Sequence, residues 1–333
     1  MKRYACLLLL LLVFGCDRAA TPVWKWTLQS RSYGQPLIDG PRVVVISEAG
    51  EVQMGELQTG KKLWTIKLES PVFGTPVLAN GRIIVGTERG NLYSVNPGDG
   101  AIQWKYSPPT SSFVSDLRVV GNTVLVPNRS GVLLAIDAQS GNVLWSNPGH
   151  KIITASPNIQ EPYVFIGGWD HFLHCMKLDT GETVWRYQVD EPIVQEGVLY
   201  RNSIVFTGHE HALWSLDIST GKLQWKLNTS MPTNLAILKD QVYVGVRNNL
   251  QEINANNGTI IRTFDLKARI NHLYVHDDQL FVLCGAKFYK IDLQNAKSEL
   301  ILTSPQPLYR IAFSPGLYVG SDQTYDIWAF SVK

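Results

Sequence analysis

The sequence has little of what marks membrane-spanning or nucleic-acid-binding proteins. Its apolar run from Leu7 to Phe14 is far shorter than the about 20 apolar residues that cross a bilayer. Lys and Arg number 30 against 28 Asp and Glu, so the charge is close to balanced. A dedicated nucleic-acid binder would carry a strongly basic face. We therefore expect no nucleic-acid partner and no membrane span at the N-terminus.

Catalytic and cofactor motifs are also missing. The sequence has no G-x-S-x-G elbow, no Gly-rich phosphate loop on a strand-to-helix turn, and no C-x-x-C among its four cysteines. Catalysis needs a nucleophile with a positioned base, or paired carboxylates in a pocket, and no pattern indicates either. We therefore predict that the protein is not an enzyme and holds no cofactor.

The N-terminus has the pattern of a processing segment. Lys2 and Arg3 precede the apolar run, which ends in Val-Phe-Gly-Cys with the cysteine at position 16. This ending resembles a bacterial lipobox, which implies cleavage after Gly15 and acylation of Cys16. We expect a lipoprotein signal peptide at 1–15 and a lipidated tether at 16–22. Loss of Lys2 and Arg3 would leave 28 basic side chains against 28 acidic ones. We therefore expect the lipid alone, and no basic patch, to attach the protein to the membrane.

A repeat of about 40 residues organises the rest of the chain. Five tryptophans each follow a glycine by four residues: Gly60/Trp64, Gly100/Trp104, Gly141/Trp145, Gly181/Trp185 and Gly221/Trp225. Two weaker copies end at Arg262 and Leu300, and a further copy with Trp26 precedes them all. Such a period is typical of repeat architectures.

Each repeat predicts four short strands and no helix. Apolar or alternating runs are separated by Gly, Asn, Asp and Pro, and no amphipathic stretch of ten or more residues occurs. Four strands per repeat indicate a blade of a β-propeller. We predict an all-β, eight-bladed propeller at 23–333, with seven blades as the alternative. The last repeat is one strand short, so residues 23–28 are expected to complete it and close the ring.

The repeated tryptophans are expected to be core residues. Each can pack between neighbouring blades while its indole N–H finds a local acceptor. Cys175 and Cys284 fall in apolar runs three blades apart, which indicates buried thiols rather than a disulfide. His174 alternates with Leu173 and Cys175, as an interior histidine would, while His272 and His276 carry no hypothesis.

The repeat phrases resemble those of the PQQ-like propeller family. The matching stretches are GNLYSVNPGDGAIQW (90–104), GVLLAIDAQSGNVLW (131–145) and HALWSLDISTGKLQW (211–225). Quinoprotein dehydrogenases of this family hold PQQ and calcium, but they have an adjacent Cys-Cys pair and long inserted loops, which this sequence lacks. A lipobox followed by a bare ring is similar to the lipoproteins of the outer-membrane β-barrel assembly machinery.

That second resemblance implies a non-enzymatic periplasmic scaffold. It would dock envelope proteins as a monomer within a complex, and its partners would include the β-barrel assembly machinery at the outer membrane. Asp17, directly after the lipidated cysteine, instead favours retention in the inner membrane under the sorting rule of well-studied Gram-negative bacteria. An inner-membrane subunit that binds a metal or redox ligand is the alternative function.

Two loops on adjacent blades bring polar side chains to one face. Aligned repeats place residues 169–171 beside residues 209–211, with His150 in a connector nearby. These residues form either a transition-metal site or a docking face. The metal candidates are His150, Asp170, His171, His209, Glu210 and His211, and the candidate docking face comprises Trp169, Asp170, His171, His209, Glu210 and His211. In the simplest interpretation, Asp170 and Glu210 only cap their turns.

Overall fold

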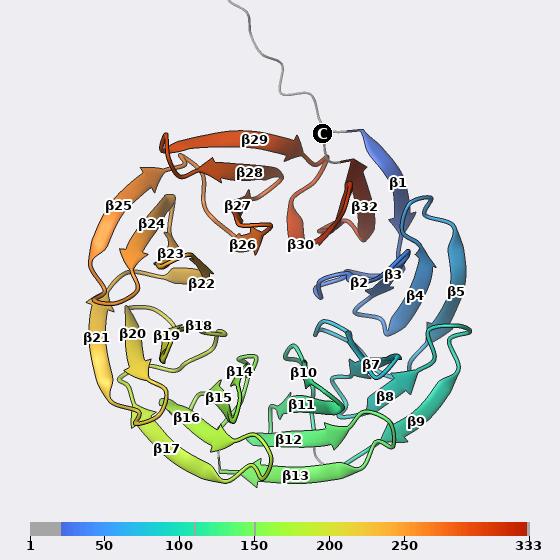
Figure 1. Cartoon of the computed structure of the whole chain (residues 1–333). Helices are drawn as coiled ribbons and strands as arrows, with labels where there is room; N and C mark the ends of the chain where they lie inside the picture. The colour runs from blue at the N-terminus through green and yellow to red at the C-terminus, as the bar shows by residue number, and fades with distance from the viewer. Residues whose placement is uncertain (1–20, 110, 150, 332–333) are drawn as a thin grey trace, which may run out of the picture.

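The computed structural model describes residues 21–109, 111–149 and 151–331. These residues form eight four-stranded antiparallel sheets set around one axis, so the eight-bladed prediction is confirmed and the seven-bladed alternative is wrong (Figure 1). The described residues contain no helix, and hence none able to cross a membrane.

In blades 1 to 7 the strands follow chain order from the innermost to the outermost. Blades 1 to 4 consist of β2 (Leu37–Asp39), β3 (Arg42–Ile46), β4 (Glu51–Glu56) and β5 (Lys62–Lys67); β6 (Val77–Ala79), β7 (Arg82–Gly86), β8 (Leu92–Val95) and β9 (Ile102–Tyr106); β10 (Arg118–Val120), β11 (Thr123–Asn128), β12 (Val132–Asp137) and β13 (Val143–Pro148); and β14 (Asn158–Gln160), β15 (Tyr163–Gly167), β16 (Phe172–Lys177) and β17 (Thr183–Gln188). Blades 5 to 8 consist of β18 (Val198–Tyr200), β19 (Ser203–Thr207), β20 (Ala212–Asp217) and β21 (Leu223–Asn228); β22 (Pro232–Leu238), β23 (Gln241–Val246), β24 (Asn249–Asn254) and β25 (Ile260–Asp265); β26 (His272–His276), β27 (Gln279–Cys284), β28 (Lys287–Asp292) and β29 (Lys297–Thr303); and β30 (Leu308–Ser314), β31 (Leu317–Asp322), β32 (Asp326–Ser331) and β1 (Pro22–Thr27).

The ring is closed by β1, which is the outermost strand of blade 8 (Figure 1). It pairs antiparallel with β32, and Thr27 lies opposite Asp326. The Thr27 hydroxyl donates to the Asp326 carboxylate at 2.6 Å. The predicted closure by residues 23–28 is therefore confirmed, because the first described strand completes the last sheet.

Neighbouring blades interlock through a tryptophan and a glycine. The indole N–H of Trp185 in blade 4 donates to the Ile218 carbonyl of blade 5 at 3.0 Å. The ring lies so close to Gly221 that a Cβ there would stand 2.6 Å from Trp185 Cδ2. Gly221 also has φ of +68°, which disfavours any other residue. The repeated spacing of Gly and Trp thus records contacts between consecutive blades.

The same arrangement recurs at five other interfaces, and it confirms that the repeated tryptophans pack between blades. The pairs are Trp24 with Gly60, Trp64 with Gly100, Trp104 with Gly141, Trp145 with Gly181 and Trp225 with Gly258. The sequence alignment is wrong at the first of them, because it matched Trp26 to Trp64. Trp24 instead bonds the Leu57 carbonyl as Trp64 bonds that of Pro97.

The interfaces between blades 6 and 7 and between blades 7 and 8 lack this interlock. Arg262 and Leu300 occupy the position of the tryptophan in the strand register, opposite Glu252 and Tyr289. Arg262 pairs with the buried Glu252 carboxylate. In the next blade the glycine position holds Ala296, at φ of +53°. An alanine fits there because no indole ring packs against it.

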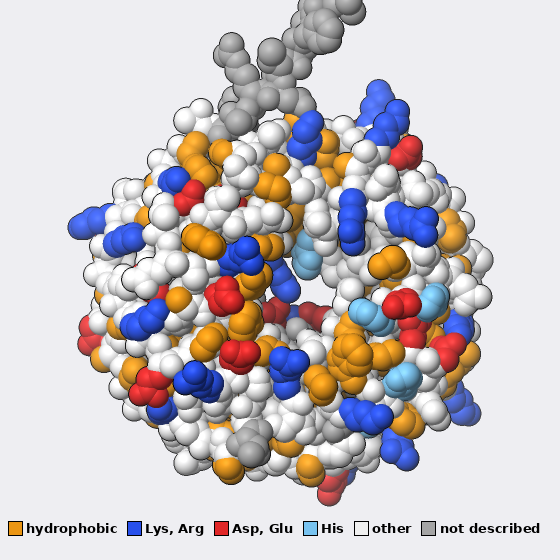
Figure 2. Space-filling model, turned by 180° about the vertical axis from the view of Figure 1, so that it is seen from behind, with side chains coloured by type: hydrophobic (Ala, Val, Ile, Leu, Met, Phe, Trp, Pro, Cys, Tyr) orange, Lys and Arg blue, Asp and Glu red, His pale blue; other side chains and the backbone are white. Residues whose placement is uncertain are grey.

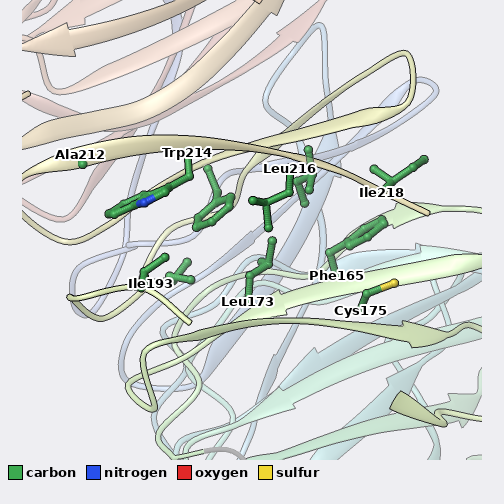
Figure 3. Packing of buried hydrophobic residues seen from close by; sticks show 11 residues of the cluster. Phe165, Leu173, Cys175, Ile193, Ala212, Trp214, Leu216 and Ile218 are labelled. Atoms are coloured by element: carbon green, nitrogen blue, oxygen red, sulfur yellow. The ribbon is translucent and has the colours of Figure 1, made fainter. Parts of the chain in front are cut away.

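The hydrophobic core lies between blades. Figure 3 shows Phe165 and Leu173 of blade 4 facing Trp214 and Leu216 of blade 5 across one such interface. Cys175 belongs to the same cluster, and it is a buried free thiol like Cys284 on blade 7, as expected. Each sheet buries both faces, since each has a neighbour on either side around the ring.

Candidate docking surface and axial cavity

One face of the ring carries both the connectors between blades and the loops between second and third strands. Backbone hydrogen bonds join the two sets: Trp169 N donates to the Ile152 carbonyl at 3.0 Å, and His209 N to that of Pro192 at 2.9 Å. We call this side the connector face. Residues 169–171 and 209–211 therefore lie on one face, as the aligned repeats predicted.

An exposed apolar patch crosses the connector face from blade 4 to blade 6. Trp169 is 41% exposed, and its ring centroid lies 6.0 Å from that of His209. Ile152 is also 41% exposed, and Met231, whose backbone N–H bonds the Glu210 carbonyl, is 60% exposed. In Figure 2 histidine and acidic side chains gather beside apolar ones at one side of the central opening. Ile152 and Met231 were not among the residues expected here.

The loop of blade 5 is held by Glu191 rather than by Glu210. The carboxylate of Glu191, which is buried, accepts from the backbone N–H of Glu210 at 2.6 Å and of His211 at 3.0 Å. The expectation that Glu210 caps its own turn is wrong. Its side chain is exposed, because the acceptor for the turn comes from the preceding connector.

Asp170 performs the capping role that the sequence indicated. Its Oδ1 accepts from Phe172 N at 3.3 Å, and its Oδ2 lies 2.6 Å from Nε2 of His174. His174 is buried, so the prediction of a satisfied interior histidine is confirmed. His171, next to Asp170, has φ of +68°, which is uncommon for a residue other than glycine.

The metal hypothesis finds no matching geometry. His211 has Nδ1 3.7 Å from Glu191 and Nε2 3.7 Å from Glu210, and it is 73% exposed. No group of three or more His, Cys, Asp or Glu in the described part of the chain is arranged to hold a metal ion. The sixth metal candidate, His150, lies outside the described residues. The alternative function of a metal-binding subunit therefore gains no structural basis.

A ring of eight polar side chains surrounds the axis, one from each blade. They line a central cavity of about 1120 Å³. The members are Gln35, Thr75, Asp116, Ser156, Glu196, Asn234, His272 and Arg310. Side chains in this ring accept backbone hydrogen bonds from the adjacent blade: Gln35 N donates to Thr75 Oγ1 at 3.1 Å and Thr75 N to Asp116 Oδ1 at 2.8 Å.

Ion pairs cross the axis between blades that are not neighbours. Arg310 of blade 8 places Nη1 3.1 Å from Asp116 Oδ2, just before β10 of blade 3. Arg118 of blade 3 donates from Nε to Glu196 Oε1, just before β18 of blade 5, at 3.1 Å. These pairs tie distant blades together, because each arginine spans the opening.

Burial and these charges set the protonation of the axial groups. Burial alone would raise the pKa of Asp116, but Arg310 and the Thr75 backbone amide outweigh it and hold this pKa below its usual range. Burial raises the pKa of Glu196, and Arg118 only partly offsets the effect. Burial lowers the pKa of His272 to about 3, and the Arg310 charge acts in the same direction. His272 is therefore neutral near pH 7.

This axial ring was not predicted from the sequence. His272 was left without a hypothesis, and Asp116, Glu196 and Arg310 were not considered. A signal was present, since the eight polar residues recur every 38 to 41 positions near the start of each innermost strand. The pairing across the axis could not be read from that spacing, because it depends on which long side chains meet in the opening.

The fold and this surface define a class: a closed eight-bladed propeller with a mixed polar and apolar connector face. A family model described as outer membrane protein assembly factor BamB matches residues 15–151 and 149–269. These matches cover more than half of the sequence, and the chain belongs to that family.

Three curated relatives carry the same name. The protein of Legionella pneumophila (strain Paris) is 26% identical over 119 residues, which is 32% of this chain and 30% of the relative. That of Shewanella oneidensis is 31% identical over 120 residues, which is 33% of this chain and 29% of the relative. That of Yersinia pestis is 21% identical over 174 residues, which is 46% of this chain and 43% of the relative. The matches thus span less than half of each relative.

Solved structures resemble the whole ring. BamB from Moraxella catarrhalis superposes with a TM-score of 0.78 at 18% identity, over 94% of this chain and 99% of that one. Saccharomyces cerevisiae Sqt1 gives a TM-score of 0.80 at 11% identity, over 95% of this chain and 100% of that one. At such identities the likeness shows the fold alone.

Proposed function

We propose that the protein is a non-enzymatic, lipid-anchored periplasmic scaffold that takes part in outer-membrane β-barrel protein assembly. Membership of a family described as an outer-membrane protein assembly factor supports the assembly role. The names of the three curated relatives agree with it. On this basis its partners are components of the β-barrel assembly machinery and other envelope proteins, bound by one copy of the chain.

The exposed patch on the connector face carries the proposal for docking. Protein interfaces are often dominated by an aromatic anchor surrounded by polar groups. Trp169 is the exposed aromatic residue here, with His209 against its ring and Ile152 and Met231 extending the apolar area. Glu210 and His211 form a polar rim on one side. Because Glu191 holds this loop in place, the surface is formed before a partner arrives.

The membrane anchor rests on the sequence alone. Cys16 and Asp17 lie outside the described residues. Asp17 favoured the inner membrane, but the family description names the outer one and gives the inner-membrane placement no support. We propose the outer membrane, with the lipid on Cys16. Separation of the two membranes on a density gradient tests this, and a protein found only in the inner membrane would contradict it.

Co-purification tests the assembly role and the docking face together. The tagged full-length lipoprotein is recovered from gently solubilised membranes, and components of the β-barrel assembly machinery are identified in the eluate. Trp169→Ala should lower recovery of the direct partner, since loss of an interface anchor costs about 2 kcal/mol or more, roughly 30-fold in affinity. Leu223→Ala, an exposed apolar residue on the outer strand β21, is the matched control.

The two parts of the proposal fail separately. If the unmodified protein recovers no assembly component, the assembly role is wrong. If it recovers one and Trp169→Ala recovers as much, the role stands and the docking face lies elsewhere on the ring.

A further inference from the structure

Two arginines stand side by side where the axial cavity opens onto the connector face. Arg247 follows β23, Arg269 lies in the connector to blade 7, and both line the cavity. Their backbones are joined, because Ile270 N donates to the Arg247 carbonyl at 3.0 Å. Both residues are exposed, and neither forms an ion pair with any residue that the structure describes. Two arginines that line the same cavity from neighbouring segments, without a counter-charge, favour an anion.

The charge balance of the cavity points the same way. Its lining includes four arginines but only two carboxylates, Asp116 and Glu196. Both carboxylates are already bound, to Arg310 and Arg118 respectively. The floor of the cavity is thus internally neutral, and the positive excess lies at Arg247 and Arg269. An anionic group entering from the connector face would meet that excess first.

The remaining walls suit a peptide rather than a small ion. Tyr33 contacts Phe73 and Tyr309 with ring centroids 5.8 and 5.1 Å apart, and all three rings line the cavity. The volume of about 1120 Å³ also exceeds the usual range of small-molecule pockets.

We propose that this mouth of the axial cavity binds an extended acidic segment of a partner protein. Its carboxylates pair with Arg247 and Arg269, and an aromatic side chain packs against Tyr33 and its two ring neighbours. This peptide site adjoins the candidate docking face, but it stands whether or not the partner belongs to the assembly machinery.

Fluorescence anisotropy with short peptides tests the charge preference. The full-length lipoprotein in detergent is titrated against fluorescein-labelled Gly-Glu-Phe-Glu-Phe-Gly and against the same peptide with Gln or Lys in place of Glu. The acidic peptide should bind at least about tenfold more tightly than the Gln or the Lys peptide. Its binding should weaken in 0.5 M NaCl, because salt screens exposed charges. Equal affinity for the three peptides would overturn the proposal.

Charge reversal locates the site. The double variant Arg247→Glu with Arg269→Glu should bind the acidic peptide at least about tenfold more weakly than the wild type does. The control, Arg89→Glu with Arg129→Glu, makes the same change of net charge on exposed arginines of the connector face that do not line the cavity. This control pair should bind the acidic peptide with an affinity within about twofold of the wild-type value. An equal loss in both pairs would mean that only the overall charge matters, and the site assignment would be wrong.

A milder pair guards against misfolding. Arg247 has φ of +57°, a conformation that asparagine tolerates, so Arg247→Asn with Arg269→Gln removes both charges with little backbone strain. This pair should lose the preference for Glu over Gln peptides while keeping the wild-type melting temperature. Retention of that preference would refute the role of the two arginines, whatever the co-purification experiment finds.

Discussion

Replacement of Gly221 by alanine tests whether the Gly and Trp repeat encodes contact between blades. Two costs are expected. A non-glycine residue at φ of +68° is strained by roughly 1–2 kcal/mol. The new Cβ would also lie 2.6 Å from Trp185 Cδ2, so the indole ring must move within a packed interface. Overpacking of this kind costs about 1–3 kcal/mol. The sum is a loss of about 2–5 kcal/mol of unfolding free energy.

Gly81→Ala is the matched control. Gly81 has φ of +69°, almost the same as Gly221, but an added Cβ would meet nothing within 4 Å. It therefore carries the backbone strain without the clash, and it should cost only roughly 1–2 kcal/mol. The difference between the two variants isolates the contact with Trp185.

Urea unfolding at equilibrium, followed by tryptophan fluorescence, measures both variants. The dependence of the free energy on urea should be the same as in the wild type, so that a shift in the midpoint reports stability. Gly221→Ala should unfold at clearly lower urea than Gly81→Ala. If the unfolding free energies of the two variants agree within about 0.5 kcal/mol, the glycine serves only the turn, and the repeat does not record packing between blades.

Two further variants test the axial ring and the connector face. Folded His272, with a pKa of about 3, takes up no proton as pH falls below about 6.5, whereas the unfolded chain does. Stability should therefore drop by about 1.4 kcal/mol per pH unit from this group, and His272→Asn should flatten the slope between pH 7 and pH 5 in urea titrations. An unchanged slope would contradict this. His171→Gly should raise stability by roughly 1 kcal/mol, since glycine relieves the strain at φ of +68°. A lower midpoint in thermal unfolding would show that the His171 side chain contributes more than its backbone costs.

The blade count and the ring closure could be predicted because the repeat spacing is a local signal. Each repeat needs its own four strands, and the one-strand deficit at the end left a single segment able to complete the last sheet. The same reasoning chose Trp26 over Trp24, since a motif match cannot show which of two nearby rings packs on Gly60 of the next blade.

The site was harder to predict because its contacts join residues that are distant in sequence. The face shared by residues 169–171 and 209–211 followed from strand order. The carboxylate that holds the second loop did not, as Glu191 lies in the preceding connector, 19 residues before Glu210. The pairing of Arg310 with Asp116 spans 194 residues. Such pairs depend on how far long side chains extend into the opening, and the length of a repeat carries no information about that.

The joining of β1 to β32 fixes an order of events when the chain is made. Strand β1 finds its hydrogen-bonding partner only after β32 has been synthesised, since Thr27 bonds Asp326 across 299 positions. Until then Trp24 and Trp26 have no completed sheet to join, and contacts of such long range form slowly. The last blade, and with it the ring, can therefore be completed only after the other seven blades have been made.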